Sequence, residues 1–210
     1  MPNGVRFYAS PDAQLKYLRR SFDQNLIDLA RTRVTKESVV WDVGANCGVF
    51  AFASAAARQI VAVEADPFLG SLIQQSSDMN GLEVVLVPAA AYSKMGLADF
   101  SIARRGRASN HLSVVEGSTQ SGGERRRLLV PTVTLDSLLE KLLPPTIIKI
   151  DVEGAELSVL EGSARLLREI RPTIYLEAGH QTRDACRDLL GAAGYSMEFS
   201  SGMDYLCEPS

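Results

Sequence analysis

Short apolar runs and longer segments with helical periodicity alternate along the first half of the chain. Residues 39–43, 60–63 and 83–87 are rich in aliphatic and β-branched side chains, which predicts buried strands. Between the last two runs, Asp66-Pro67 supplies an N-cap and an N1 proline for a helix that stops at Asn80-Gly81. This order predicts a parallel sheet with helices on its faces.

The pattern changes between residues 92 and 134 and then returns to alternation. Two short strands, 97–102 and 128–134, are expected on either side of an aperiodic segment that is rich in glycine and serine. The later part predicts these elements in order: a short helix from Thr134, a strand at 146–151, a helix at 155–170, a strand at 173–177, a helix at 183–190 and an antiparallel pair at 195–199 and 204–207.

Residues 14–33 precede the first strand and carry apolar side chains at three- and four-residue steps, which predicts one or two amphipathic helices within an N-terminal segment, 1–37. Ser21 and Gln24 have the spacing of a capping box. Such helices either form a lid over a ligand cleft or cover a face of the sheet, and we favour the second interpretation.

The first strand ends in a glycine turn that leads into an alanine-rich segment, 49–57. Gly44 and Gly48 flank Asn46, so the turn lacks the G-x-G-x-x-G spacing of nicotinamide-binding proteins. Twenty residues after Gly44, the second strand ends in Glu64, where a carboxylate can accept hydrogen bonds from ribose hydroxyls. A strand, a glycine turn and a helix, followed by this acid, predict a nucleotide-type cofactor site.

The overall composition places few limits on function. The chain has 210 residues, 46% apolar and 22% charged side chains, and a net charge of −3, which predicts one domain over 1–210 and no global attraction to nucleic acid. The three cysteines are far apart and form no C-x-x-C pair, so we expect neither disulfides nor zinc. Without a membrane-spanning run or a signal-peptide core, the protein is expected to be cytoplasmic.

Residues 104–127 form a locally basic segment inside the insertion 92–134. Six arginines, at 104, 105, 107, 125, 126 and 127, face only two glutamates, which gives a net charge of +4. The segment is either a loop that attracts an anionic acceptor or a solvated loop. It contains no aromatic residue for base stacking, so we do not expect it to bind single-stranded nucleic acid.

Five short motifs together resemble those of the FkbM family of S-adenosylmethionine-dependent methyltransferases. They are D-V-G-A-N-C-G at 42–48, V-E-A-D-P at 63–67, T-L-D at 134–136, I-K-I-D-V-E-G-A-E at 148–156, and R-P with L-E at 171–172 and 176–177. The resemblance covers about residues 39–199. It implies an α/β class I methyltransferase (Rossmann-like) three-layer sandwich, with a mostly parallel seven-stranded sheet whose last strand is antiparallel, and S-adenosyl-L-methionine as cofactor.

The family pattern implies a cofactor site built from the first motifs. Asp42, Gly44, Ala45, Asn46 and Gly48 would surround the methionine and ribose, and Glu64 would hold the ribose diol. Ala65, Asp66, Ala90 and Ala91 would lie near the adenine. Many class I enzymes carry an acid where Ala90 and Ala91 stand, so adenine recognition would be left to backbone groups. Glycines that only form turns, and an Asp42 that only caps the next helix, are the structural alternatives.

Lys149, Asp151 and Glu153 are the leading catalytic candidates. Alternation places them on one face at the carboxyl end of a strand, where open α/β sheets bind ligands. Alternatively, Lys149 and Asp151 form an ion pair that only orders the sheet edge. His180, after the next strand, has a pKa range suited to a base, and Glu177 ends that strand. Two carboxylates are a thin ligand set, so we expect no metal.

The predicted function is methyl transfer to a hydroxyl of a small acceptor such as a sugar or a polyketide. Because the leaving group departs neutral, alignment of nucleophile and methyl supplies much of the acceleration, aided by a base for the hydroxyl proton. Two alternatives remain: a non-catalytic cofactor-binding module that acts through a partner, and a nicotinamide oxidoreductase, which the glycine spacing disfavours.

Overall fold

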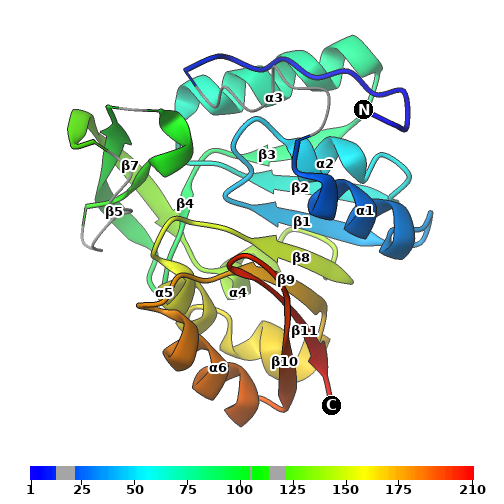
Figure 1. Ribbon diagram of the computed structural model, residues 1–210, viewed down its shortest axis with the longest axis vertical. Helices are drawn as coiled ribbons and strands as arrows, with labels where there is room; N and C mark the ends of the chain where they lie inside the picture. Colours follow the sequence, from blue (N-terminus) through cyan, green and yellow to red (C-terminus); the bar gives the residue numbers. More distant parts are fainter. Residues whose placement is uncertain (13–21, 105, 114–121) are drawn as a thin grey trace.

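A seven-stranded sheet lies at the centre of the computed structural model, which describes residues 1–12, 22–104, 106–113 and 122–210 (Figure 1). The strand order is β10-β11-β9-β8-β1-β2-β3. β11 runs antiparallel to both of its neighbours, and the other pairings are parallel. The strands are β1 (Val39–Val43), β2 (Gln59–Val63), β3 (Val84–Val87), β8 (Ile147–Ile150), β9 (Thr173–Glu177), β10 (Tyr195–Ser201) and β11 (Asp204–Pro209). The predicted sheet with an antiparallel last strand is confirmed.

Helices cover both faces of this sheet, so the predicted three-layer sandwich is also confirmed (Figure 1). One face carries α1 (Gln24–Arg33), α2 (Val49–Ala53) and α3 (Pro67–Asn80), and the other carries α4 (Leu135–Leu138), α5 (Glu156–Glu161) and α6 (Arg183–Ala192). α2 ends earlier than its alanine-rich sequence suggested. α3 begins as predicted, because the Asp66 carboxylate accepts from the Phe68 N–H at 2.9 Å.

Strand alternation decides which side chains reach which face. Trp41 and Val43 pack into the core beneath α4, α5 and α6, whereas Val40 packs against Phe50 of α2. The same alternation sends Asp42 of β1 and Lys149 of β8 towards the α1–α2 side. The polar residues therefore emerge on one face, at the carboxyl ends of the central strands.

The helix predicted over 155–170 is wrong as a single element. It breaks after α5, and Leu166–Ile170 forms a separate π-helical segment. At Gly162 the chain lies so close to the Tyr92 carbonyl oxygen that an added Cβ would approach it to 2.4 Å. The Asp136 carboxylate then accepts from the Arg165 and Leu166 N–H groups at 2.9 and 2.8 Å. Asp136 starts the second segment like a cap, a contact between distant residues that periodicity does not reveal.

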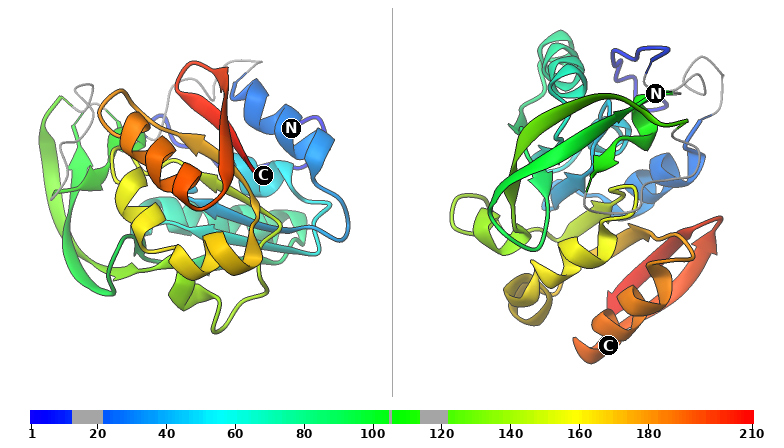
Figure 2. Two further views of the ribbon diagram at one scale, coloured as in Figure 1. Left: turned by 90° about the horizontal axis from the view of Figure 1, so that it is seen from below. Right: turned by 90° about the vertical axis from the view of Figure 1, so that its left-hand side faces the viewer.

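A second, four-stranded sheet stands beside the first (Figure 2). Its strands are β4 (Ala90–Ala91), β5 (Gly96–Ala103), β6 (His111–Leu112) and β7 (Glu124–Val133), and a 3₁₀ turn, Arg107–Ser109, links β5 to β6. Arg125, Arg126 and Arg127 lie in β7, so the prediction of a continuous basic loop over 104–127 is wrong for its last part. Arg105 and residues 114–121 lie outside the described residues.

α1 combines the two roles considered for the N-terminal segment. Ile27 and Ala30 are buried, and Ala30 packs against Val40 and Phe50, as a sheet-covering helix would. Asp23 and Leu26, at its start, line a cavity at the sheet edge. Residues 13–21, with Ser21 of the predicted capping box, lie outside the described residues. In the described ranges, none of the helices has the length and apolarity needed to cross a bilayer.

Candidate active site

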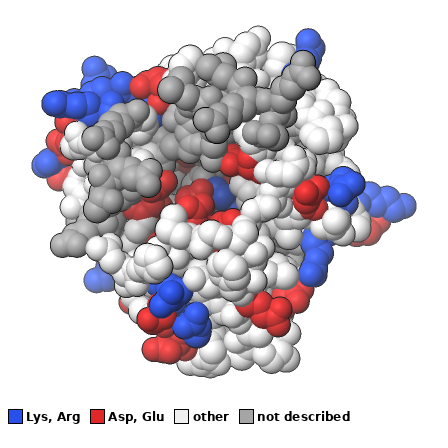
Figure 3. Space-filling model, in the orientation of Figure 1, with Lys and Arg blue, Asp and Glu red and all other residues white. Residues whose placement is uncertain are grey.

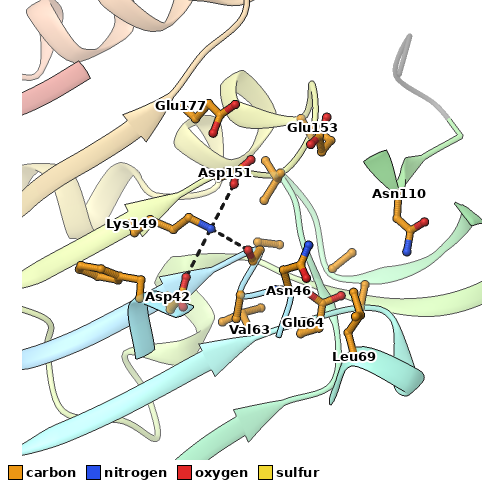
Figure 4. A pocket seen from close by; sticks show the side chains of 18 of the residues that line it. Asp42, Asn46, Val63, Glu64, Leu69, Asn110, Lys149, Asp151, Glu153 and Glu177 are labelled. Carbon is orange, nitrogen blue, oxygen red and sulfur yellow. Dashed lines mark hydrogen bonds and ion pairs between the residues drawn. The ribbon is translucent and has the colours of Figure 1, made fainter. Parts of the chain in front are cut away.

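A large cavity opens at the carboxyl ends of β1, β2, β8 and β9 (Figure 4). Its empty space is about 1010 Å³, counting the part open to solvent. Most of the predicted site residues line it: Asp42, Gly44, Ala45, Asn46, Glu64, Ala65, Ala90, Ala91, Lys149, Asp151 and Glu153. The cavity thus collects side chains that are more than 100 positions apart in the sequence.

A contact within the protein requires glycine at position 44. Its φ of 72° is left-handed, and an added Cβ would approach the Asp151 carbonyl oxygen to 1.9 Å. The sequence predicted a turn that a ligand approaches closely, and the structure adds that the loop after β8 is a close neighbour. The glycine turn and the Asp151 loop are therefore in direct backbone contact.

Glu64 connects the glycine turn to the start of α3. One carboxylate oxygen accepts from the Asn46 N–H and the other from the Asp66 N–H, both at 2.7 Å. Burial raises the pKa of Glu64 to about 7, against the lowering effect of these two hydrogen bonds. The carboxylate is 7% exposed and lines the cavity, so its remaining lone pairs can accept hydrogen bonds from a ligand.

Lys149 is the central cation of the site. Its amine donates to the Gly44 carbonyl oxygen at 2.7 Å and lies 3.5 Å from the Asp42 carboxylate and 3.3 Å from that of Asp151 (Figure 4). Burial acts to lower the pKa of Lys149, but these two carboxylates outweigh it and raise the pKa above its usual range. Lys149 therefore stays charged and holds Asp151 in place. It is unsuited to act as a base.

Asp42 has the capping role considered above in addition to lining the cavity. Its carboxylate accepts from the Ala51 N–H in the first turn of α2, at 3.0 Å. Burial raises the pKa of Asp42 despite the neighbouring Lys149 charge. Asp42 and Lys149 are both almost completely buried, so each needs the other to remain charged.

Glu153 lies in a loop at the cavity mouth and has a left-handed φ of 52°. Burial, followed by the negative charges of Asp151 and Glu177, raises the pKa of Glu153 to about 8. A carboxyl group with such a pKa is a better proton acceptor near neutral pH than an ordinary glutamate. Among the predicted catalytic residues, Glu153 has the electrostatics of a general base.

Three predicted site residues are not among those that line the cavity. Gly48, with a φ of 84°, is the N-cap of α2, and His180 is exposed. Asp66 is buried behind the wall, where its carboxylate caps α3 and accepts from Arg107 and Asn110. The structure therefore indicates structural roles for Gly48 and Asp66, and the role predicted for His180 has no support from its position.

The insertion supplies cavity residues that the sequence pattern missed. Arg107 and Asn110 line the wall and both bind Asp66, and Arg107 also lies 4.4 Å from the centre of the Phe68 ring. Asp12 ties the same wall to the amino-terminal segment, through Arg107 at 2.8 Å and Arg125 at 2.9 Å. These arginines are paired within the protein, so the interpretation as an anion-binding loop does not hold for them. Phe100 and Leu112 add apolar surface.

Within the described ranges, no three His, Cys, Asp or Glu side chains are grouped so that they could hold a metal ion. All three cysteines are buried and unbridged.

Comparison with known proteins assigns the family. The model of the methyltransferase FkbM domain matches residues 42–197, which is most of the chain and includes the cavity-lining motifs. The chain belongs to the FkbM methyltransferase family. It is therefore a methyltransferase, which decides against the nicotinamide oxidoreductase alternative.

One relative and two solved structures show how this FkbM methyltransferase compares with others. The chain is 27% identical over 181 residues to the hexuronic acid methyltransferase AglP of Haloferax volcanii, with 85% of this chain and 72% of the relative covered. The crystal structure of methyltransferase FkbM from Methylobacillus flagellatus has a TM-score of 0.55 at 17% identity, covering 83% of this chain and 44% of that chain.

The second structure is a T. thermophilus 16S rRNA methyltransferase in complex with AdoMet and guanosine. It has a TM-score of 0.55 at 12% identity, covering 97% of this chain and 45% of that chain. This chain thus spans less than half of each of these two structures, and at such low identity the likeness concerns the fold alone.

Proposed function

We propose that this FkbM methyltransferase transfers a methyl group from S-adenosylmethionine to a hydroxyl of a small, sugar-like acceptor. The observation that carries the proposal is the placement of Glu64 and Glu153 in one cavity. Glu64 is a cofactor-type acid joined to the glycine turn, and Glu153 is a carboxyl group with a raised pKa at the mouth.

The polar groups of the glycine turn suit an adenosyl cofactor. The Asn46 side-chain oxygen is buried, has no hydrogen-bond partner among the described residues and belongs to a residue that lines the cavity, so it is available to a ligand donor. Glu64 would hold the ribose hydroxyls, and Ala65, Ala90 and Ala91 leave room for the adenine ring beside Leu69. When bound, the cofactor supplies a methyl group on a positively charged sulfur, and its transfer leaves a neutral thioether.

The residues at the other end of the cavity, Glu153 and Asp151, would bind and deprotonate the acceptor. Glu153 accepts the proton as the hydroxyl oxygen forms its bond to the methyl carbon, and Asp151, held by Lys149, orients the hydroxyl. The sugar-like acceptor class is supported by the relative, whose name gives hexuronic acid as its substrate.

The test is a calorimetric titration with S-adenosylhomocysteine, followed by assays with labelled cofactor on a panel of hydroxylated sugars. Glu64→Gln should weaken binding by about tenfold to a hundredfold, because the amide replaces a charged acceptor. Glu83→Gln, on the exposed chain before β3, is the matched control and should bind as the wild type does. Equal binding by wild type and Glu64→Gln, or saturable binding without turnover on any acceptor, would contradict the proposal.

A further inference from the structure

Glu156 is a buried acid at the end of the motif that supplies the acceptor end of the cavity. The run at 148–156 brings Lys149, Asp151 and Glu153 to the cavity wall, whereas Glu156 is not among the residues that line it. Glu156 is only 3% exposed. A buried carboxylate needs hydrogen-bond partners, so the groups that contact Glu156 indicate what it does.

The Glu156 carboxylate joins the loop after β8 to the loop after β9. Its Oε1 accepts from the Gly154 N–H at 2.8 Å, and its Oε2 accepts from the Thr182 hydroxyl at 3.0 Å. Burial raises the pKa of Glu156, and these hydrogen bonds act against that rise. Because both neighbours donate, the surroundings of the side chain are matched to a carboxylate.

Thr182 contributes to this link at the expense of an ordinary helix cap. It occupies the N-cap position of α6, where a threonine side chain commonly accepts from an N–H of its own helix. The Thr182 side chain makes no such capping bond and donates to Glu156 instead. The hydroxyl therefore serves to hold the Glu156 carboxylate.

The loop that Glu156 holds has a backbone conformation that needs support. Glu153 has a φ of 52° and Gly154 a φ of 106°, so two successive residues are left-handed. Glu153 has a side chain that disfavours this conformation, which persists only where the surrounding structure holds it. The Gly154 N–H belongs to the peptide unit directly after Glu153, so its bond to Glu156 fixes the direction of that unit.

The direction of Glu153 matters because charged groups surround it. Figure 3 shows Asp and Glu side chains gathered around the hollow on this face. Burial raises the pKa of Glu153 most, followed by the negative charges of Asp151, Glu177 and Glu156, and Lys149 acts in the opposite direction. A turn of the peptide unit after Glu153 would change both its reach into the cavity and its distances from these charges.

We propose that Glu156 is the positioning residue for Glu153. By holding the Gly154 N–H with one oxygen and the Thr182 hydroxyl with the other, Glu156 keeps the carboxyl group of Glu153 directed at the acceptor hydroxyl. Glu156 does not line the cavity, so it acts through Glu153 and leaves the cofactor end unchanged. The inference rests on the proposed function, which gives Glu153 the role of base.

The first test is independent of catalysis and follows hydrogen exchange of the Gly154 amide. Glu156→Ala removes the acceptor, so this amide should exchange at least about tenfold faster than in the wild type. In Glu156→Gln the side-chain oxygen still accepts from Gly154, so exchange should stay within about threefold of the wild type. An unchanged exchange rate in Glu156→Ala would overturn the proposal.

The second test measures kcat and the affinity for S-adenosylhomocysteine. Glu156→Ala should lower kcat about tenfold to a hundredfold, because the base is misplaced, and leave the affinity within about twofold. Glu156→Gln should restore most of the activity, with a pH profile displaced to lower pH because a negative neighbour of Glu153 is gone. Thr182→Val should lower kcat in the same direction, which guards against poor folding of one variant. Glu161→Ala, at the exposed end of α5, is the matched control.

A double variant separates positioning from a general loss of structure. In a chain that already carries Glu153→Gln, Glu156→Ala should lower kcat by less than about twofold further. A similar loss in both backgrounds, or an equal fall in S-adenosylhomocysteine affinity, would overturn the proposal. Wild-type activity of Glu153→Gln, or no turnover on any acceptor, would instead contradict the proposed function, and exchange of the Gly154 amide would still decide whether Glu156 holds the loop.

Discussion

At the Glu64 end of the cavity the carboxylate is held by two backbone N–H groups, whereas at the Lys149 end buried side chains of opposite charge hold one another. Glu64 accepts from two N–H groups, and Asp66 behind it is bound by Arg107 and Asn110. At the opposite end, the Lys149 amine lies 3.5 Å from the Asp42 carboxylate and 3.3 Å from that of Asp151. The first end therefore depends on main-chain contacts, and the second depends on a single lysine.

Lys149→Met should have the largest effect, because the Lys149 amine contacts the Gly44 carbonyl as well as the Asp42 and Asp151 carboxylates. It would leave Asp42 buried without its cation and release the Gly44 carbonyl, at an expected cost of about 3–5 kcal/mol in the free energy of unfolding. Urea denaturation measures the change. Lys141→Met, at an exposed position, is the control and should stay within about 0.5 kcal/mol of wild type.

Glu153→Gln, at the end of the cavity where we propose that the acceptor binds, should raise the stability of the fold and lower the activity. The folded-state pKa of Glu153, about 8, is above the unfolded value, so its ionisation destabilises the fold increasingly as pH rises from about 4.5 to 8. The glutamine variant should therefore be more stable than wild type above pH 8, by about 2 kcal/mol after allowance for solvent screening.

The same variant should lose most of its methyl transfer. In the wild type, activity should rise with pH through about 8, because the base must be ionised, and this rise should disappear with glutamine at residue 153. Thermal and urea unfolding over a pH series would check the stability claim. A variant that keeps the activity and the pH profile of the wild type would contradict the role of Glu153 as base.

Arg125→Gln is expected to have the smallest effect. Arg125 and Asp12 are each more than one-third exposed, and such surface pairs contribute about 0.2–1 kcal/mol. Arg107→Gln should cost more, because Arg107 is mostly buried and also binds the fully buried Asp66. Equal costs for the two arginine variants, measured by urea denaturation, would show that the Asp66 contact adds little.

The sequence was sufficient for features that depend on local pattern. Apolar runs identified the strands of the main sheet, and Asp66-Pro67 and Asn80-Gly81 located both ends of α3. The resemblance assigned Glu64 to the cofactor, and strand alternation placed Lys149 and Asp151 at the carboxyl end of a strand. All three line one cavity, because parallel strands end at the same edge of the sheet.

Features made by contacts between distant residues were not accessible in this way. The resemblance assigned Asp66 to the adenine. Nothing in the neighbouring sequence shows that Arg107 and Asn110, some 40 residues later, bind its carboxylate. Arg107 and Asn110 were missed as cavity residues because they reach the wall only through the fold of the second sheet. The break in the predicted helix at 155–170 depends in the same way on the approach of Gly162 to Tyr92.

The bond network of Asp12 has a practical consequence for handling this enzyme. Asp12 holds two arginines that are about 95 and 113 positions further along the chain, so the amino-terminal segment braces the cavity wall at Arg107 and Asn110. A shortened protein that begins at α1 would keep the whole FkbM domain yet lose that brace.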